Sequence, residues 1–169
     1  MPTHALHTPQ VAKAFSCYIF DAQGRVLITR RALGKRVWPG VWSNSLHGHA
    51  QPGEALDQAL LRRSACELGI AVEQVELLMD DFSQPADPAC AGVEVFRAVT
   101  RDAPLPAPDE VMEWQWVKAE TVLSSASATP FLYSPWMVAQ LEAILVRGLY
   151  LRWRGNAIKR SNGRFPYRW

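Results

Sequence analysis

The segment EALDQALLRRSACELG, residues 54–69, constrains the fold more than any other part of the sequence. Its apolar residues recur every three or four positions, which is the spacing of an amphipathic helix. Gly69 is well placed to end the helix, because glycine readily adopts the left-handed conformation of a helix C-terminus. We expect a sheet to cover the apolar face, which carries Ala55, Leu56, Ala59, Leu60 and Cys66.

Two charged residues, Arg63 and Glu67, fall on this same apolar face. A charge is costly to bury unless it is paired or bound to an ion. One interpretation is an internal ion pair, because the two residues are four positions apart. The other is that this end of the helix borders a cation-binding cleft. Helical periodicity favours neither interpretation over the other.

The rest of the chain mixes strand and helix patterns without an internal repeat. Ala14–Phe20 and Arg25–Arg30 are rich in β-forming residues and predict a hairpin around DAQG. VEVFRAVT and EWQWV predict two further strands. Ser134 is expected to cap a last helix, with Pro135 in its first turn. This combination predicts a mixed α/β layer fold.

Length and composition are those of a single soluble domain. A chain of 169 residues is long enough to bury a substantial core. It shows no signal-peptide pattern and no apolar run near the roughly 20 residues of a membrane span. Its three cysteines include no C-x-x-C pair, so we expect reduced thiols. These features favour a cytoplasmic location.

The C-terminal end differs from the rest in charge. We divide the chain into a domain over residues 1–150 and a basic, aromatic extension over residues 151–169. No acidic residue follows Glu142, whereas Arg147, Arg152, Arg154, Lys159, Arg160, Arg164 and Arg168 are all basic. Such an extension could bind nucleic acid, an anionic surface or a diphosphate. A solvated extension without a partner is an equal alternative.

The helical segment also fits a known motif. Gly48, Glu54, Arg62, Glu67 and Gly69 match the spacing of the Nudix box, G-x5-E-x7-R-(E)-U-x-(E)-E-x-G-U. Arg63 and Cys66 stand where the usual box has glutamates that gather magnesium ions. The resemblance implies the Nudix fold, a mixed β-sheet sandwiched between helices. The missing carboxylates argue against ordinary pyrophosphohydrolase activity.

Four segments resemble the type I isopentenyl-diphosphate isomerases more closely. They are TRRALGKRVWPGVWSNSLHGH, RRSACELG, DEVMEWQW and ATPFLYSPWMV. The resemblance implies an enzyme that protonates the alkene of isopentenyl diphosphate and removes another proton, giving dimethylallyl diphosphate. It implies Mg²⁺ as cofactor and a small-molecule prenyl diphosphate as partner. We expect neither nucleic-acid binding nor stable membrane insertion.

The resemblance also assigns roles to individual residues. Arg31, Lys35 and Arg63 match basic residues that hold the diphosphate. Glu67 matches the carboxylate that binds Mg²⁺ together with the diphosphate, and His49 matches a metal-site histidine. Trp136, in SPWMV, matches the tryptophan that faces the carbocation.

Several catalytic positions depart from the family pattern. His47, in NSLHGH, replaces the catalytic cysteine of N-S-x-C-G-H, and we expect it to act as a base or a metal ligand. The family's second catalytic motif is E-x-E on a strand, and only Glu94 of it remains here. Two possible alignments place Glu94 on opposite faces of that strand. Gln84 replaces a tyrosine, and His7 is the candidate for a second metal histidine. We therefore expect Mg²⁺ but no complete histidine site for a second metal.

Three further functions remain open beside isomerisation. A diverged member could cyclise or rearrange a longer prenyl diphosphate through a carbocation, as a terpene cyclase does. A protein that binds diphosphate without turning it over is the second. A Nudix hydrolase is the least favoured, because its box lacks the usual carboxylates.

Overall fold

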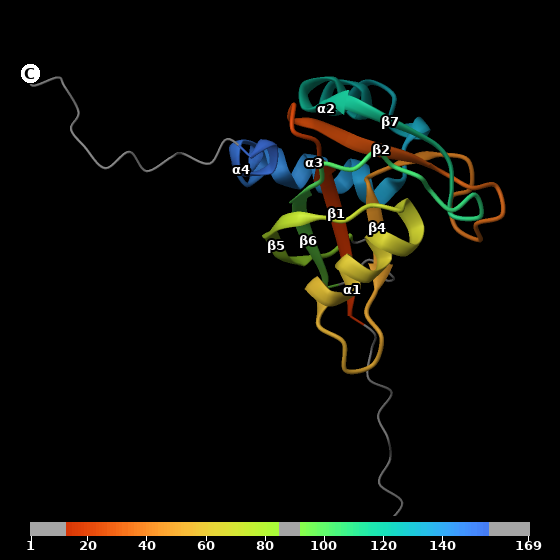
Figure 1. Ribbon diagram of the computed structural model, residues 1–169. Helices are drawn as coiled ribbons and strands as arrows, with labels where there is room; N and C mark the ends of the chain where they lie inside the picture. Colours follow the sequence, from red (N-terminus) through yellow and green to blue (C-terminus); the bar gives the residue numbers. More distant parts are fainter. Residues whose placement is uncertain (1–12, 85–91, 156–169) are drawn as a thin grey trace, which may run out of the picture.

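The computed structural model describes residues 13–84 and 92–155. Within these ranges one mixed sheet forms the centre of the molecule (Figure 1). Its strands are β1 (Ala14–Phe20), β2 (Arg25–Arg31), β3 (Trp42–Ser43), β4 (Leu46–His49), β5 (Glu73–Phe82), β6 (Val93–Val99) and β7 (Val111–Lys118). The strand order is β3-β2-β1-β6-β5, with β4 paired to β1 and β7 paired to β2. Strands β1 and β6 are parallel, whereas the other pairs are antiparallel.

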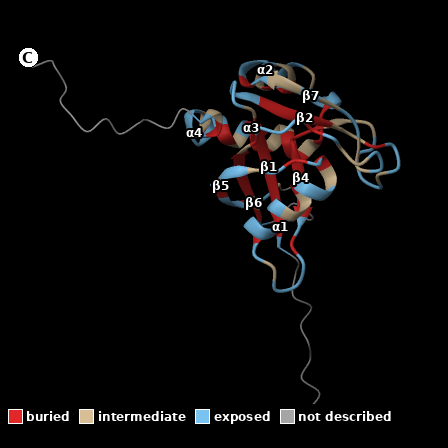
Figure 2. Ribbon diagram, in the orientation of Figure 1, coloured by how far each residue is buried: buried red, intermediate tan, exposed pale blue. Residues whose placement is uncertain are grey.

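The expected hairpin is present and consists of β1 and β2, the first two strands in the described residues. Asp21 fixes its turn, because its Oδ1 accepts hydrogen bonds from the backbone N–H groups of Gln23 and Arg25. All of β1 is buried, as the central position of this strand requires (Figure 2). The sheet therefore has an apolar layer on each side of β1.

Helix α1 (Leu56–Arg63) covers one face of the sheet and continues as a π-helix, η1 (Ser64–Leu68). Gly69 ends it with φ of 65°, as predicted. Leu56, Ala59 and Leu60 are buried against the sheet, whereas Ala55, at the N-cap, and Cys66 are exposed, contrary to the wheel. The wider π-helical turn shifts later residues around the axis, so a wheel drawn for an α-helix misplaces Cys66.

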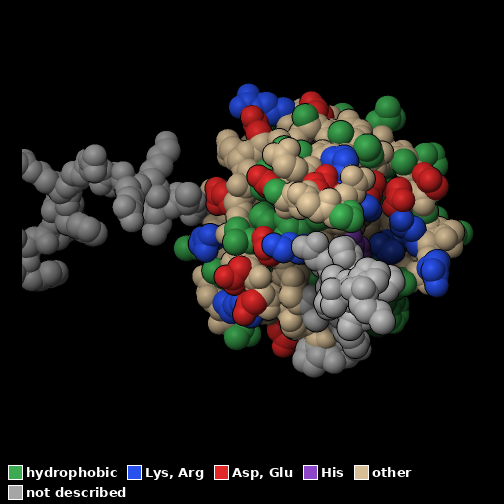
Figure 3. Space-filling model, turned by 90° about the horizontal axis from the view of Figure 1, so that it is seen from below, with side chains coloured by type: hydrophobic (Ala, Val, Ile, Leu, Met, Phe, Trp, Pro, Cys, Tyr) green, Lys and Arg blue, Asp and Glu red, His purple; other side chains and the backbone are tan. Residues whose placement is uncertain are grey.

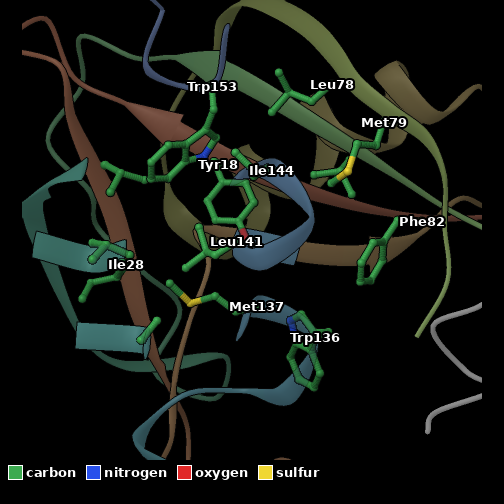
Figure 4. Packing of buried hydrophobic residues seen from close by; sticks show 14 of the residues in the cluster. Tyr18, Ile28, Leu78, Met79, Phe82, Trp136, Met137, Leu141, Ile144 and Trp153 are labelled. Carbon is green, nitrogen blue, oxygen red and sulfur yellow. The ribbon is translucent and has the colours of Figure 1, made fainter. Parts of the chain in front are cut away.

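Three helices cover the other face: α2 (Ala119–Ala128), α3 (Pro135–Val146) and α4 (Tyr150–Arg154). A short 3-10 turn, η3 (Pro130–Leu132), joins α2 to α3. Figure 4 shows the core on this side, where Tyr18 lies among Leu141, Ile144 and Trp153. The predicted sandwich of a mixed sheet between helices is confirmed. No helix in the described ranges is long and apolar enough to cross a membrane, and the cytoplasmic location stays a prediction.

Ser134 occupies the predicted N-cap position of α3, but its side chain does not cap the helix. Its Oγ lies 2.8 Å from Oγ of Ser43 instead. This contact ties the first turn of α3 to the end of β3. Trp136 lies on that turn, so its position depends on the contact between α3 and the sheet (Figure 4).

The first residues of the expected C-terminal extension belong to the folded core. Trp153 on α4 is fully buried, with ring centroids 5.6 Å from Tyr18 and 5.5 Å from Phe20. Arg97 Nε donates a hydrogen bond to the main-chain oxygen of Trp153 at 3.2 Å. The division at residue 150 stays a prediction, because residues 156–169 lie outside the described ranges.

Candidate active site

A polar cavity of about 120 Å³ opens where β2, β4 and the end of α1 meet. Its lining brings together the predicted site residues Arg31, Lys35, His47, His49, Arg63 and Glu67. They come from segments far apart in the sequence, which the β1–β2 and β1–β4 pairings place side by side. Figure 3 shows a histidine side chain and basic side chains together in a hollow of the surface. The cavity is therefore a basic pocket with imidazoles at its wall.

Arg31 is held by the loop that follows β2. Its Nε and Nη2 donate to the carbonyl oxygen of Val37 at 3.0 and 2.9 Å, and Nε also reaches that of Trp38 at 3.2 Å. Its Cζ lies 5.0 Å from the ring centroid of Trp136. Partial burial lowers the pKa of Arg31, while Glu110 and Glu67 act to raise it. An arginine fixed in this way presents a preorganised positive charge to an anion.

Two ion pairs line the rest of the pocket. Lys35 pairs with Glu110, and Arg63 pairs with Glu67. Burial raises the pKa of Glu67 to about 7, the charge of Arg63 lowers it, and nearby Glu110 raises it again. The ion pair between Arg63 and Glu67 is thus confirmed, and the two residues also border a cleft. Binding of a cation in this cleft stays a prediction.

Gly48 lets Arg63 enter the pocket. It pairs with Phe15 in β1 and faces α1, where the Arg63 side chain crosses directly over it. A Cβ at position 48 would lie 2.4 Å from Nε of Arg63 and 2.7 Å from its Cδ. Such a contact is too short for any side chain, so only glycine at this position allows Arg63 to keep its place in the pocket.

Gly48→Ala should therefore weaken diphosphate binding with little loss of stability. The clash involves the flexible end of Arg63, which can move away into solvent but then no longer points into the pocket. We expect the Kd for inorganic diphosphate to rise about tenfold, as for loss of one charged hydrogen bond. Calorimetric titration and thermal unfolding would measure the two effects. Unchanged affinity in a folded variant would show that Arg63 does not contact the anion.

His47 and Trp136 form the second part of the site. His47 pairs with Ser16 in β1, which places the imidazole on the face of the sheet that α3 covers. The imidazole stacks on the indole of Trp136 with ring centroids 5.3 Å apart and planes at 29°. Nε1 of Trp136 donates to Oδ1 of Asn44 at 3.0 Å. An ionisable ring and an aromatic ring thus lie together beside the basic pocket.

Glu94 does not belong to this site in the described structure. It pairs with Phe15, and paired residues of neighbouring strands point to the same face of a sheet. Phe15 packs with the residues of α1, whereas His47 and Trp136 lie on the α3 face. Glu94 is also absent from the lining of the cavity. The described structure therefore does not support the predicted catalytic role for Glu94.

The predicted metal ligands are only partly brought together. In residues 13–84 and 92–155 no three His, Cys, Asp or Glu side chains converge on one point. His49 is exposed with its ring 6.1 Å from that of His47, and His7 lies outside the described residues. Magnesium usually takes one or two protein carboxylates and completes its shell with substrate phosphates and water. Glu67 fits such an ion carried by a diphosphate, but the described residues do not fit a cage made of protein ligands alone.

An apolar groove of about 540 Å³ lies close to the basic pocket. Its lining includes Tyr133 and Pro135, just before Trp136, and Trp38, whose carbonyl binds Arg31. Gln84, at the position of the family's tyrosine, also lines it. The groove offers room for hydrocarbon next to a site for phosphate.

Two residues of the site carry no role in the sequence prediction. Glu110 pairs with Lys35, and Asn44 binds Trp136. Both lie inside segments that resemble the family, DEVMEWQW and NSLHGH, but the resemblance assigned no function to either residue. The available signal was a polar side chain next to an apolar strand, which predicts a buried hydrogen bond without naming the partner.

Comparison with known proteins agrees with this geometry. A model of the NUDIX domain matches residues 11–137. The isopentenyl-diphosphate Delta-isomerase of Clavibacter michiganensis is 47% identical over 150 residues, covering 85% of this chain and 77% of the relative. That of Klebsiella pneumoniae is 44% identical over 144 residues, covering 82% and 78%.

Solved structures support the fold alone. A Deinococcus radiodurans protein superposes with a TM-score of 0.60 at 21% identity, covering 70% of this chain and 74% of its own. The MutT protein of Methanosarcina mazei gives 0.58 at 17% identity, covering 81% and 94%. From the NUDIX match and the close relatives, the chain belongs to the isopentenyl-diphosphate Delta-isomerase family of NUDIX-domain proteins.

Proposed function

We propose that this protein isomerises isopentenyl diphosphate to dimethylallyl diphosphate, with His47 in place of the family's catalytic cysteine. One observation carries the proposal: a basic pocket for a diphosphate adjoins a stacked imidazole and indole. A substrate with an anionic head and an alkene a few bonds away matches both parts. The similarity to isomerases over most of the chain supports the same reaction.

Arg31, Lys35 and Arg63 are the proposed diphosphate ligands. Two of them are paired with carboxylates, Lys35 with Glu110 and Arg63 with Glu67. These carboxylates hold the cationic side chains in place before substrate arrives, which lowers the entropy lost on binding. Arg31 differs from these two residues, because its hydrogen bonds go to the main-chain oxygens of Val37 and Trp38 and not to a carboxylate.

Glu67 is the proposed protein ligand of a divalent cation, which we take to be Mg²⁺. Its carboxyl lies in the cavity wall beside the cationic residues. The ion would neutralise part of the diphosphate charge and hold the head group in one orientation. The histidine site expected for a second metal has no role in this proposal.

The reaction adds a proton to the terminal alkene carbon. It removes another proton from the methylene group that is bonded to the other alkene carbon. The tertiary carbocation between these steps needs a water-free environment and an electron-rich neighbour. Trp136 is 3% exposed, and its indole lies against Arg31 and His47, which line the pocket. We assign the removal of the proton to His47, because imidazole accepts protons near neutral pH. The proton that is added comes from solvent, and His47 returns the proton that it removes to solvent, so the reaction has no net proton change.

Arg31→Ala is expected to weaken binding of an unreactive prenyl thiodiphosphate by about 10- to 100-fold, the effect of losing one charge-assisted contact. Isothermal titration with and without MgCl2 would measure it, and we expect tight binding only with the metal. Arg25→Ala is a matched control, because Arg25 makes a surface ion pair with Asp21 at the β1–β2 turn. Equal affinity of the Arg31→Ala variant and the control would contradict the assigned diphosphate site.

The substrate itself can be identified by a panel of prenyl diphosphates. Incubation with isopentenyl, geranyl, farnesyl and geranylgeranyl diphosphates, followed by mass spectrometry and chromatography, should show conversion of the first alone. A longer chain would have to occupy the apolar groove near Trp38 and Tyr133. Conversion of a longer substrate would favour the cyclisation alternative, and binding without any product would favour a diphosphate-binding protein.

A further inference from the structure

Asn44 lies at the centre of a buried hydrogen-bond network behind the candidate site. Its side chain is 1% exposed. Its Nδ2 lies within hydrogen-bonding distance of Oγ of Ser16 at 2.7 Å and of the main-chain oxygen of Leu46 at 2.7 Å. Its Oδ1 accepts from Nε1 of Trp136 at 3.0 Å and from Oγ of Ser43 at 3.0 Å. Both ends of the amide are therefore used.

These bonds join the segments that carry the two rings of the site. Asn44 stands three residues before His47, in the connection between β3 and β4. Trp136 stands on the first turn of α3, on another part of the chain. The bond between Asn44 and Trp136 therefore links the strand that carries the imidazole directly to the helix that carries the indole.

We propose that Asn44 is a positioning residue, whose Oδ1 fixes the indole of Trp136 in its stacked arrangement with the imidazole of His47. An indole has a single polar atom, Nε1. A hydrogen bond from this atom restricts rotation of the ring within the core. With that bond present, the ring centroids are 5.3 Å apart and the planes differ by 29°. The inference rests on the proposed function, because it states how the aromatic face is held for the carbocation.

Loss of the acceptor would leave a buried indole N–H without a partner. Such a group is unfavourable in an apolar site, so the ring is expected to turn until Nε1 finds another acceptor or water. A displacement of about 1 Å can reduce a catalytic rate by about 100-fold when the reacting groups must be aligned. Substrate binding through Arg31, Lys35 and Arg63 does not involve the indole N–H. The proposal thus predicts a fall in kcat with little change in KM.

A double-mutant cycle separates this role from a general structural one. Asn44→Ala should lower kcat about 100-fold in the wild-type background but about threefold or less in the Trp136→Phe background, because phenylalanine has no N–H to position. Tyr18→Phe is the matched control. It removes a buried bond from Tyr18 to Gln140 in the same network and leaves Asn44 and Trp136 untouched, so kcat should stay unchanged. An equal loss of kcat in both backgrounds would overturn the proposal.

Asn44→Asp keeps the side-chain size and an oxygen for the indole, and so tests the proposal if Asn44→Ala does not fold. We expect its kcat to stay within about tenfold of wild type although its melting temperature falls. A loss as large as in the Trp136→Phe variant, from a folded Asn44→Asp protein, would contradict the role of Oδ1.

A spectroscopic measurement tests the bond without any turnover. In a ¹⁵N-labelled protein the Trp136 indole N–H signal is identified by its loss in Trp136→Phe. We expect this proton to exchange with solvent slowly in wild type and in Asn44→Asp, and about tenfold faster in Asn44→Ala. Fast exchange in wild type would overturn the inference. Slow exchange in a protein that converts no prenyl diphosphate would contradict the proposed function alone.

Discussion

Replacement of His47 by alanine is expected to lower kcat by about three orders of magnitude, the usual effect of removing a general acid or base. The imidazole stacks on Trp136 beside the basic pocket, and the proposed diphosphate ligands lie on other segments. Affinity for an unreactive prenyl thiodiphosphate should therefore change by less than about threefold. Steady-state kinetics and calorimetry would measure the two quantities.

His47→Cys extends this test. It restores the family's side chain at this position, but Glu94 points to the α1 face and cannot complete the usual pair. We therefore expect His47→Cys to be as inactive as His47→Ala. Full activity of His47→Ala would mean that the proton transfers come from another group. Recovery in His47→Cys alone would mean that Glu94 or another residue acts with the thiol.

Deletion of all residues after Arg152 is expected to destabilise the protein by about 3–5 kcal/mol, the usual effect of losing a large core aromatic side chain. Trp153 is fully buried between Tyr18 and Phe20, and its main-chain oxygen accepts a bond from Arg97. The melting temperature should fall by roughly 10 °C. Thermal unfolding followed by circular dichroism would measure this change.

Deletion after Gly155 is the matched control, because it keeps all of α4 and removes only residues 156–169. We expect this variant to keep the wild-type melting temperature within about 2 °C, because it retains Trp153 and all of α4. The KM of this shorter protein then tests one of the alternatives for the basic, aromatic extension, namely that it binds the diphosphate. Equal stability of the two truncated proteins would show that Trp153 does not hold the core together.

Regular periodicity made part of this fold predictable. The β1–β2 hairpin and α1 have clear apolar repeats and turn residues, and both were found close to their expected bounds. Strand β5 was not predicted, because its solvent-facing residues and irregular pairing with β6 blur the alternation. Helix α2 was also missed, because AETVLSSASA is rich in serine and owes its helical state to packing of Val122 and Ala126.

The candidate site was predictable only where residues matched a motif. The cationic residues and Trp136 came from family resemblance. The structure places the cationic residues around one cavity and Trp136 against Arg31. The face of Glu94 could not be decided, because a shift of one residue in strand register reverses every side chain. The pairing of Glu94 with Phe15 decides it. The partners of Asn44 depend on contacts between α3 and the sheet, which no local pattern encodes.

Conversion of isopentenyl diphosphate in D2O tests the proposed activity most directly. The 169-residue chain would be incubated with isopentenyl diphosphate and MgCl2, with His47→Ala as the inactive control, and the products followed by ¹H and ²H NMR. We predict dimethylallyl diphosphate with deuterium in the methyl group that protonation creates, and neither product nor deuterium with the variant. Unchanged, deuterium-free isopentenyl diphosphate, recovered from wild-type protein that binds the substrate, would contradict the proposal.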